Sequence, residues 1–345
     1  MKANQQIIVS APGSIMITGE HAVVYGYPAV VCAIDQRVHI TATPLTARII
    51  QIISEIADPV ELPLDSFRVE GPMRFVLAAL ALYRDRLEHG LRLVITSQID
   101  PMLGLGSSAA VTVATLGLLH ELTSQEATSP LLESKVRLHT AALKLTRQLQ
   151  GRGSGADLAA SLHGGLLGYQ LPLEAIDETL PERGVQAEDT TRLRTQTQRL
   201  SPEIGHAQII ALPQPPQISL CYCGYKTPTG EVLARVAAKM QGHEVAFAAL
   251  YGRMGACALA ALHAAQQSDW TKFADHLNAY QALMVELNVS DAILDALVSR
   301  AREEIDVTAA KISGSGLGDS ILAMGRVPPQ HQLAPFTKEG FVLHE

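Results

Sequence analysis

The chain has 345 residues, of which 47% are hydrophobic and 18% charged, a composition typical of globular proteins and not of disordered or collagen-like ones. This length predicts about two domains with a cleft between them. The formal net charge of −7 argues against unspecific binding to nucleic acid or to anionic lipid, because such binding depends on clustered lysine and arginine.

The cysteines and the apolar runs indicate the compartment. Cys32, Cys221, Cys223 and Cys257 lack the density of a disulfide framework, and the second and third lie too close together for typical metal-hairpin spacing. We expect reduced thiols in the core. The N-terminal stretch lacks the apolar core of a secretory signal, and we find no run of eighteen or more apolar residues. We therefore expect a cytoplasmic protein with no membrane partner.

The first half of the chain mixes strands and helices. Apolar or alternating residues predict strands over 7–11, 29–34, 38–42 and 91–97. Apolar residues at helical spacing predict helices over 73–83, 109–122, 134–149 and 157–162. Pro12 and Gly13 predict a break after the first strand, and glycine-rich segments precede the second and the fourth helix.

The second half begins with a polar stretch, residues 171–205, which has little periodicity. We expect an inter-lobe connection or a surface excursion there. The elements predicted beyond it are strands over 218–223, 309–313 and 320–324 and helices over 229–240, 245–266 and 270–287. A third glycine-rich loop separates the last two strands.

The strongest chemical signal is the loop ahead of the helix over 109–122. It consists of Gly104, Leu105, Gly106, Ser107, Ser108 and Ala109. Glycine lets backbone N–H groups approach an anion, and the helix N-terminus adds the positive end of its dipole. The two serine hydroxyls suit phosphate oxygens or a Mg²⁺ ion held among them. The alternative is a glycine turn in which a serine caps the helix.

Two further segments combine glycine with polar residues. Residues 311–320 form a glycine-rich turn between apolar strands, which either lets the backbone approach a ligand or makes a tight hairpin. Asp157 follows a Gly-Ser-Gly run at the start of a helix. Its carboxylate is either a general base for a hydroxyl or a first-turn acid that complements the helix dipole. The residues alone leave both alternatives open.

Glu20 and His21 lie in an apolar neighbourhood, where charged groups seldom lack a partner. A structural salt bridge or a buried hydrogen bond is therefore the alternative to a functional role for this pair. His139 and His163 show no metal-ligand spacing with a carboxylate or a cysteine, so we expect them to be structural or exposed. This pattern argues against a metalloenzyme.

The order of these segments resembles that of the three motifs of the GHMP kinase superfamily. Residues 11–26, which read Ala-Pro-Gly-Ser-Ile-Met-Ile-Thr-Gly-Glu-His-Ala-Val-Val-Tyr-Gly, look like the first motif in the form seen in mevalonate kinases. Residues 104–109 are similar to the second motif, and residues 311–320 resemble the third. The spacing covers nearly the whole chain, and the run Gly-Glu-His-Ala-Val-Val-Tyr-Gly is its most specific part.

The resemblance implies an α+β two-lobed GHMP kinase fold. It implies a ribosomal-protein-S5-like, ATP-binding N-terminal lobe over 1–180 and a ferredoxin-like C-terminal lobe over 181–345. ATP is expected against the second-motif loop, with Mg²⁺ by Ser108. Asp157 matches the catalytic aspartate of the family, which takes the proton from the acceptor hydroxyl or orients it. The resemblance also suggests a homodimer.

The resemblance further assigns residues to the acceptor side of the cleft. Residues 20–21 match the first-motif pair near the acceptor, and residues 314–316 match the loop that closes on the reacting groups. Residues 226–229 resemble a threonine-bearing segment by which mevalonate and phosphomevalonate kinases bracket the substrate. The substrate-binding candidates are Glu20, His21, Gly314, Ser315, Gly316 and Thr229.

Three positions depart from the family pattern. Ser14 stands where mevalonate kinases usually carry a lysine that stabilises the transferring phosphoryl group, so this catalytic position lacks the positive charge. Thr146 stands where an acidic residue usually holds Mg²⁺. Asp319 replaces a small residue of the third motif and is either a relocated Mg²⁺ ligand or part of a capped turn. Three cations close to Thr146 in the sequence are candidates to replace the missing positive charge at Ser14: Lys144, Arg147 and Arg152.

The resemblance favours ATP-dependent phosphorylation of the 5-hydroxyl of mevalonate, with ATP and Mg²⁺ as cofactors and a small alcohol as the substrate. His21 supports this acceptor, because phosphomevalonate kinases usually carry tyrosine there. Phosphomevalonate kinase or another GHMP acceptor kinase is an alternative, since the sequence around Asp157 and residues 226–229 also resemble those enzymes. A non-catalytic binding or regulatory protein is the other alternative, motivated by Ser14 and Thr146.

Overall fold

The structure is a computed structural model, and it describes residues 6–100, 103–123, 131–151, 153–171, 206–328 and 336–344. The predicted connection from residue 172 onward, the predicted lobe boundary at 180/181 and Arg152 lie outside the described residues. The strands are β1 (Ile7–Thr18), β2 (Ala29–Leu45), β3 (Ile49–Ser54), β4 (Ala57–Pro63), β5 (Gly90–Ser97), β6 (Leu166–Gln170), β7 (Gln208–Leu212), β8 (Ile218–Tyr222), β9 (Ala309–Ser313), β10 (Ser320–Met324) and β11 (Val342–His344). The described α-helices are α1 (Arg74–Tyr83), α2 (Ser107–Thr123), α3 (Leu131–Gln150), α4 (Ala156–His163), α6 (Thr229–Met240), α7 (Glu244–Gln266), α8 (Trp270–Glu286) and α9 (Ala292–Arg302), and the 3₁₀ turns are η1 (Ala22–Tyr25) and η2 (Arg84–Arg86).

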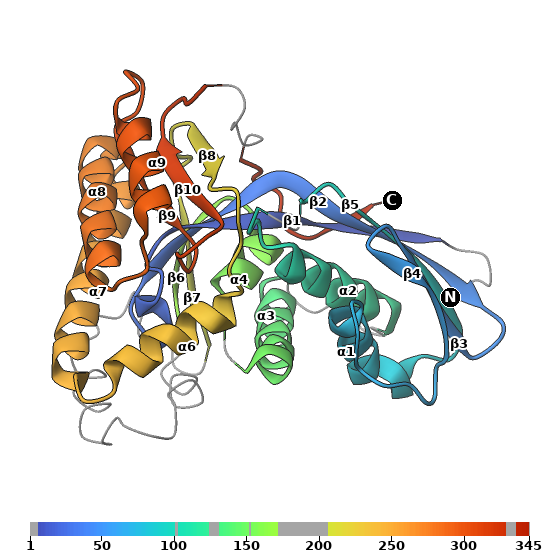
Figure 1. The fold of residues 1–345 in the computed structure, drawn as a ribbon. Helices are drawn as coiled ribbons and strands as arrows, with labels where there is room; N and C mark the ends of the chain where they lie inside the picture. The colour runs from blue at the N-terminus through green and yellow to red at the C-terminus, as the bar shows by residue number, and fades with distance from the viewer. Residues whose placement is uncertain are drawn as a thin grey trace.

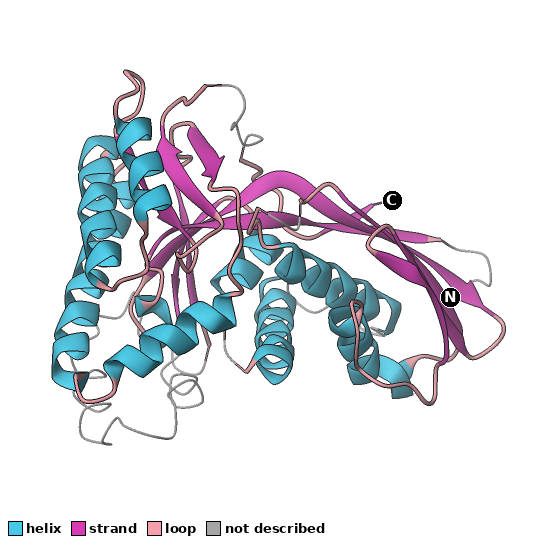
Figure 2. Ribbon diagram, in the orientation of Figure 1, coloured by secondary structure: helices cyan, strands magenta, loops and turns pink. Residues whose placement is uncertain are grey.

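The larger sheet carries the N-terminal half of the chain. Its order is β11-β1-β2-β5-β3-β4, and β6 pairs with both β2 and β7. Figures 1 and 2 show α1 to α4 gathered on one face of this sheet. Two of its strands, β7 and β11, come from beyond residue 180. Sheet membership therefore does not follow the predicted lobe boundary.

The smaller sheet has the order β8-β10-β9, with all pairs antiparallel. Helices α8 and α9 pack against β9, and α7 packs against α8, beside the small sheet in Figure 1. A second buried cluster fills this part and includes Ala22 of the first motif and Tyr27, which directly follows that motif. A Cβ on Gly255 of α7 would lie 2.0 Å from the ring of Tyr27, and α7 also packs against η1 of the first motif.

The helices predicted from apolar spacing are confirmed as α1, α2, α3, α4, α6, α7 and α8. The strands predicted in both halves are also confirmed, and the two over 29–34 and 38–42 join into the single strand β2. The break predicted at Pro12 and Gly13 is wrong. Strand β1 continues through these residues, and a register shift between Pro12 and Ser14 accommodates them. A β-bulge of this kind keeps a strand paired where proline interrupts the ladder.

All four cysteines are free, as expected, although only Cys32 and Cys221 are fully buried. Among the described residues, α7 has the length and composition of a membrane-spanning helix, with a mean hydropathy of 1.6 over its most apolar window. Its buried side chains pack in both core clusters, the N-terminal ones in the second and those from Ala261 onward in the first, which is also how a core helix of a globular protein is placed. The expected lack of a membrane partner stays a prediction.

Candidate active site

The second-motif loop ends in the N-terminus of α2. The N–H of Ala110 donates to the carbonyl of Gly106 at 3.0 Å, so Gly106 occupies the N-cap position and residues 107–109 form the first turn. The N–H groups of a first turn have no acceptor within the helix. Ser107 and Ser108 are half-buried there, and Ala109 is buried. The arrangement can therefore present several N–H donors and two hydroxyls to one anion.

Ser14 joins the first motif to this loop. Its N–H donates to the carbonyl of Leu105 at 2.9 Å, and its side chain is only 3% exposed. Gly106 has φ +70°, and a Cβ there would lie 2.3 Å from the hydroxyl oxygen of Ser14. Glycine is needed at this position for both reasons. The structure thus brings a catalytic candidate against the cofactor-binding loop.

The third-motif loop also lies against the second-motif loop. Gly314 and Gly316 have φ values of +85° and +80°, which favour glycine. The carboxylate of Asp319 lies next to Gly104, since a Cβ there would be 3.3 Å from Oδ2. The second and third motifs are therefore in contact in this structure, although the sequence alone does not predict which residues meet.

His21 connects the first motif to the third. Its Nε2–H donates to the carbonyl of Ser315 at 2.8 Å, which assigns the proton to Nε2 and leaves Nδ1 as an acceptor. Nδ1 is buried without a partner among the described residues, as is the hydroxyl of Ser315. Burial lowers the pKa of His21 to about 4; the bond to Ser315 raises it and the charge of Lys311 lowers it. His21 is therefore neutral, with one acceptor available to a ligand.

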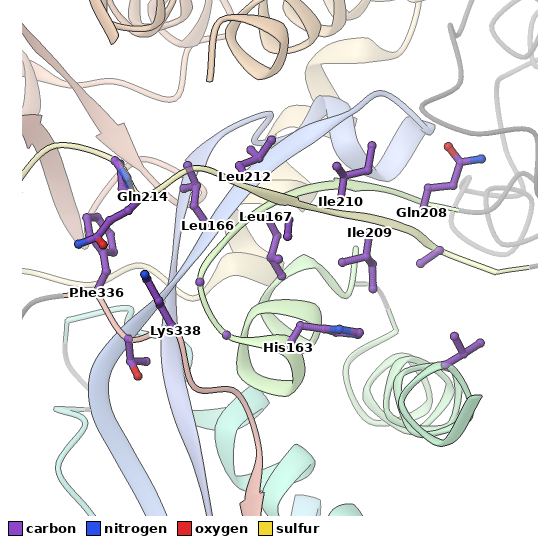
Figure 3. A pocket seen from close by; sticks show the side chains of 17 residues that line it. His163, Leu166, Leu167, Gln208, Ile209, Ile210, Leu212, Gln214, Phe336 and Lys338 are labelled. Atoms are coloured by element: carbon purple, nitrogen blue, oxygen red, sulfur yellow. The ribbon is translucent and has the colours of Figure 1, made fainter. Parts of the chain in front are cut away.

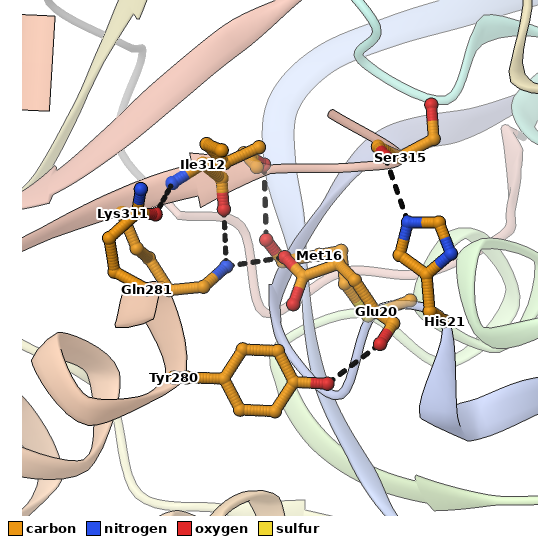
Figure 4. A network of polar contacts seen from close by, with 9 residues as sticks. Met16, Glu20, His21, Tyr280, Gln281, Lys311, Ile312 and Ser315 are labelled. Carbon is orange, nitrogen blue, oxygen red and sulfur yellow. Dashed lines mark hydrogen bonds and ion pairs between the residues drawn. The ribbon is translucent and has the colours of Figure 1, made fainter. Parts of the chain in front are cut away.

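Glu20 forms a buried ion pair with Lys311, with 2.5 Å between Oε1 and Nζ and exposed fractions of 3% and 0%. Figure 4 shows this region, where the hydroxyl of Tyr280 also donates to the carbonyl of Glu20 at 2.7 Å. The ammonium group lies 5.6 Å from the centre of the Tyr280 ring. This geometry fits the structural alternative that the sequence left open for Glu20. The sequence did contain a signal for this ion pair, because a lysine, Lys311, lies in an otherwise apolar strand.

Three side chains fix the loop that precedes Asp157. Arg147 donates to the carbonyl of residue 153 at 3.0 Å, Tyr169 donates to that of residue 154 at 2.6 Å, and His139 donates to that of residue 155 at 3.0 Å. The structural role expected for His139 is confirmed. The roles of Arg147 and Tyr169 were not predicted, because tyrosine in a short apolar strand carries no functional signal.

Asp157 itself is half-buried in the first turn of α4. One of its oxygens accepts the N–H of Leu158 at 2.9 Å, as in the dipole alternative. Burial raises the pKa of Asp157, and the bonds from backbone N–H groups lower it. A carboxylate with a raised pKa is a better proton acceptor near neutral pH. Since α4 packs against β1 and α2, Asp157 comes from an element beside the glycine loop.

Thr229 is the predicted substrate-binding residue in the segment over 226–229. It begins α6 and is exposed. Its neighbour Thr227 instead donates to the carbonyl of Leu317, and a Cβ on Gly318 would lie 2.8 Å from the nitrogen of Thr227. Thr227 and its neighbour Lys226 therefore contact the third loop, and the role of Thr229 stays a prediction.

Three family models match the chain. Residues 74–165 match the GHMP kinases N terminal domain, and residues 261–333 match the GHMP kinases C terminal domain. Residues 1–44 match a galactokinase galactose-binding signature. The first two models span the glycine loop, the Asp157 loop and the third motif in the expected order. The chain belongs to the GHMP kinase superfamily. As a GHMP kinase it is an ATP-dependent phosphotransferase with an alcohol acceptor.

Individual relatives agree with this assignment. The mevalonate kinase of Pyrococcus furiosus is 28% identical to this GHMP kinase, over 96% of this chain and 90% of the relative. The Lin0012 protein of Listeria innocua has a TM-score of 0.79 at 21% identity, covering 99% of this chain and all of the other. A Streptococcus pneumoniae phosphomevalonate kinase complex has a TM-score of 0.68 at 17% identity, covering 92% of each chain. These likenesses confirm the α+β GHMP kinase fold.

The residues that could compensate for Ser14 and Thr146 in this GHMP kinase are only partly described. Thr146 is 8% exposed, and its hydroxyl has no partner among the described residues. Arg147 donates a hydrogen bond to the carbonyl of Gly153, and Lys144 is exposed. None of the described contacts joins these cations to the second-motif loop.

One cavity of this GHMP kinase, of about 680 Å³, lies away from these motifs. Figure 3 shows that it is bounded by His163, at the opposite end of α4 from Asp157, and by β6, β7 and residues 336–338. None of the predicted site residues lines it. We therefore place the candidate active site at the three motifs and not in this cavity.

The neutral His21 predicts how stability depends on pH. Its pKa is about 4 in the folded protein and about 6.5 in an unfolded chain, so the unfolded state binds the additional proton. Stability is fully present above about pH 6.5 and is lost as the pH falls towards 4, by about 2 kcal/mol at about pH 5. Urea unfolding at several pH values measures this. We expect a flatter profile for His21→Asn, and an unchanged profile would contradict the assignment.

The contact between Gly106 and Ser14 predicts a second effect. Gly106→Ala adds a Cβ against the serine hydroxyl, so the loop must move and nucleotide affinity should fall about tenfold or more, equivalent to about 1.4 kcal/mol. Gly151→Ala is the matched control, because Gly151 has φ +74° but nothing within 4 Å of a Cβ. Both variants carry the left-handed strain. Isothermal titration with ATP should detect a loss of affinity only for Gly106→Ala.

Proposed function

We propose that this GHMP kinase transfers the terminal phosphoryl group of ATP to the 5-hydroxyl of mevalonate. The observation that carries the proposal is the match to a mevalonate kinase over 96% of this chain and 90% of the relative. The contacts among the three motifs support it, because they bring Ser14 and Asp319 against the glycine loop and leave an acceptor on His21 without a partner. Asp157, whose pKa burial raises, lies on α4, which packs against β1 and α2. Phosphoryl transfer depends chiefly on such positioning and on charge neutralisation.

On the nucleotide side, we assign the phosphates of ATP to the loop from Gly104 to Ala109. The first-turn N–H groups of α2 and the hydroxyl of Ser107 donate to phosphate oxygens, and the hydroxyl of Ser14 lies against the same loop. The half-buried hydroxyl of Ser108 fits an oxygen ligand of Mg²⁺. When bound, Mg²⁺ supplies charge neutralisation between the β- and γ-phosphates.

On the acceptor side, Asp157 accepts the proton of the hydroxyl, and the bonds to residues 153–155 hold its loop in place. The free Nδ1 of His21 accepts a hydrogen bond from a substrate hydroxyl, and the loop over 314–316 closes on the reacting groups. Glu20 acts indirectly, by its ion pair with Lys311. Thr229, which is exposed at the start of α6, is a further candidate on the acceptor side.

Phosphomevalonate kinase activity is the second candidate. The solved Streptococcus pneumoniae phosphomevalonate kinase covers 92% of this chain with a TM-score of 0.68, so the fold suits a phosphorylated acceptor as well. A sugar acceptor is a further possibility within the family, since residues 1–44 match the galactokinase signature. Activity measurements must therefore identify the acceptor substrate.

The proposal includes a cytoplasmic enzyme with an ATP-binding lobe over 1–180, a second lobe over 181–345, no nucleic-acid or membrane partner, and a homodimeric state. Light scattering after size-exclusion chromatography measures the assembly. A mass near twice the chain mass of 36.9 kDa supports the dimer, and a mass near one chain contradicts it.

The test of the acceptor is a coupled ADP-release assay with ATP, Mg²⁺ and a panel of mevalonate, phosphomevalonate, homoserine and galactose. We expect turnover on mevalonate, with ³¹P NMR showing a phosphomonoester at the 5-position. Turnover confined to phosphomevalonate or galactose would replace the proposed acceptor with that compound. ATP binding without turnover on any acceptor would favour the non-catalytic alternative.

A further inference from the structure

Asp319 has a backbone that is fixed from both sides. Its N–H donates to the carbonyl of Tyr225 at 3.0 Å, and its own carbonyl accepts the N–H of Cys223 at 2.9 Å. The residue has φ +61° and is 8% exposed. The position at the start of β10 is therefore determined by the backbone, and the carboxylate is not needed to hold the turn.

The carboxylate of Asp319 points between two glycine loops. Its Oδ2 lies 3.3 Å from the position of a Cβ on Gly104 and 4.0 Å from that on Gly314. Its Oδ1 is buried and has no hydrogen-bond partner among the described residues. A buried polar atom without a partner is costly, and a capping role would have given it a backbone N–H. The orphaned oxygen indicates that a ligand completes this site.

The place of Asp319, between the phosphate-binding loop at Gly104 and the third-motif loop at Gly314, favours a cation as that ligand. An ionised carboxylate beside a phosphate-binding loop repels the phosphates unless a cation lies between the two. The described residues hold no group of three or more histidine, cysteine or acidic side chains that could bind a metal. A metal at this position must therefore share its ligands with the nucleotide.

Mg²⁺ fits this description, because proteins usually bind it through one or two carboxylates together with substrate phosphates and water. Thr146, at the usual acidic position of the family, offers only a hydroxyl. We propose that Asp319 would be the carboxylate ligand of the Mg²⁺ that accompanies ATP in this protein, in addition to the hydroxyl of Ser108. The assignment rests on the proposed function only in requiring ATP at the second-motif loop.

The test measures how strongly Mg²⁺ tightens nucleotide binding. The probe is AMPPNP, titrated calorimetrically in excess Mg²⁺ and in EDTA, with no acceptor present. For Asp319→Asn we expect the Mg²⁺-dependent gain in affinity to fall about 10- to 100-fold. The affinity without metal should be equal or higher, because the repulsion is removed. A merely structural role would weaken both titrations alike.

Two features keep the test interpretable. Asparagine and glycine both tolerate φ +61°, so Asp319→Gly serves if Asp319→Asn does not fold. Asp275→Asn is the matched control, since Asp275 is an exposed acid on α8 and its loss changes the net charge equally. Binding of Mn²⁺ in the presence of AMPPNP, followed by electron paramagnetic resonance, gives a direct readout that should drop only in the Asp319 variants.

An unchanged Mg²⁺ dependence in the Asp319 variants, or an equal loss with and without metal, overturns the inference while leaving the proposed function intact. Failure of the unaltered protein to bind AMPPNP counts against the proposed function itself. Because no acceptor is used, the result does not depend on whether mevalonate is the substrate.

Discussion

Asp157→Asn is expected to lower kcat with the proposed acceptor mevalonate by about 10²- to 10⁴-fold, the usual contribution of a general base. Asparagine has nearly the same shape, and its side-chain oxygen can still accept the N–H of Leu158, which the carboxylate accepts at 2.9 Å. The fold of the loop should therefore survive while the basic group is lost. The coupled ADP-release assay measures kcat, and calorimetry measures the affinity for ATP.

The control is the affinity for ATP, which should change by less than about threefold, or about 0.6 kcal/mol. Asp275→Asn, which removes a distant exposed acid, should leave both quantities unchanged. A large loss of ATP affinity in Asp157→Asn would contradict the assignment of Asp157 to the acceptor side. A kcat near that of the unaltered protein would instead favour the alternative in which the carboxylate only complements the dipole of α4.

The pH dependence gives a separate check on Asp157. Burial raises its pKa above the usual 3.8, so the basic form is lost at a higher pH than for an exposed aspartate. The activity should fall as the pH decreases through this raised pKa. His21 is neutral until about pH 4 and does not cause an earlier loss by titration. A rate that stays constant down to the ordinary aspartate pKa would contradict the proposed role.

Seven of the eight described α-helices were predicted, because their apolar residues recur at helical spacing, whereas α9 was not. The strands were less predictable, and β3, β4, β6, β7 and β11 were not predicted. Strand β6 has only five residues, all buried, so no alternation marks it. Strand β11 has three residues and is defined by its pairing with β1. Such short elements depend on partners far away in the chain, which local patterns cannot identify.

The candidate site, like the fold, was predicted only in part. The glycine spacing in residues 104–109 marked a loop that can meet an anion, and the motif order suggested which segments act together. The sequence did not predict that Asp319 faces Gly104, or that Glu20 pairs with Lys311. These contacts depend on how β9 and β10 dock against the first motif. Local patterns carry no information about that docking.

Lys311→Met is expected to destabilise the protein by about 3–5 kcal/mol, because it leaves the buried carboxylate of Glu20 without its counter-charge. Burial raises the pKa of Glu20, and Lys311 opposes that shift. The ammonium group also contacts the ring of Tyr280. Denaturant unfolding at about pH 7 measures the loss. Lys272→Met, which breaks the ion pair of an exposed lysine with Asp269, should change the stability far less, because exposed ion pairs contribute little.

The double variant Glu20→Gln with Lys311→Met distinguishes charge from packing. Removing both charges leaves no unpaired ion, so the double variant should be more stable than Lys311→Met alone. Losses that simply add would mean that the two side chains act independently, which contradicts the pair. The pair also connects the turn before η1 in the first motif to β9, which leads into the third loop. If it positions that loop, the double variant should recover stability but retain a raised KM for the acceptor.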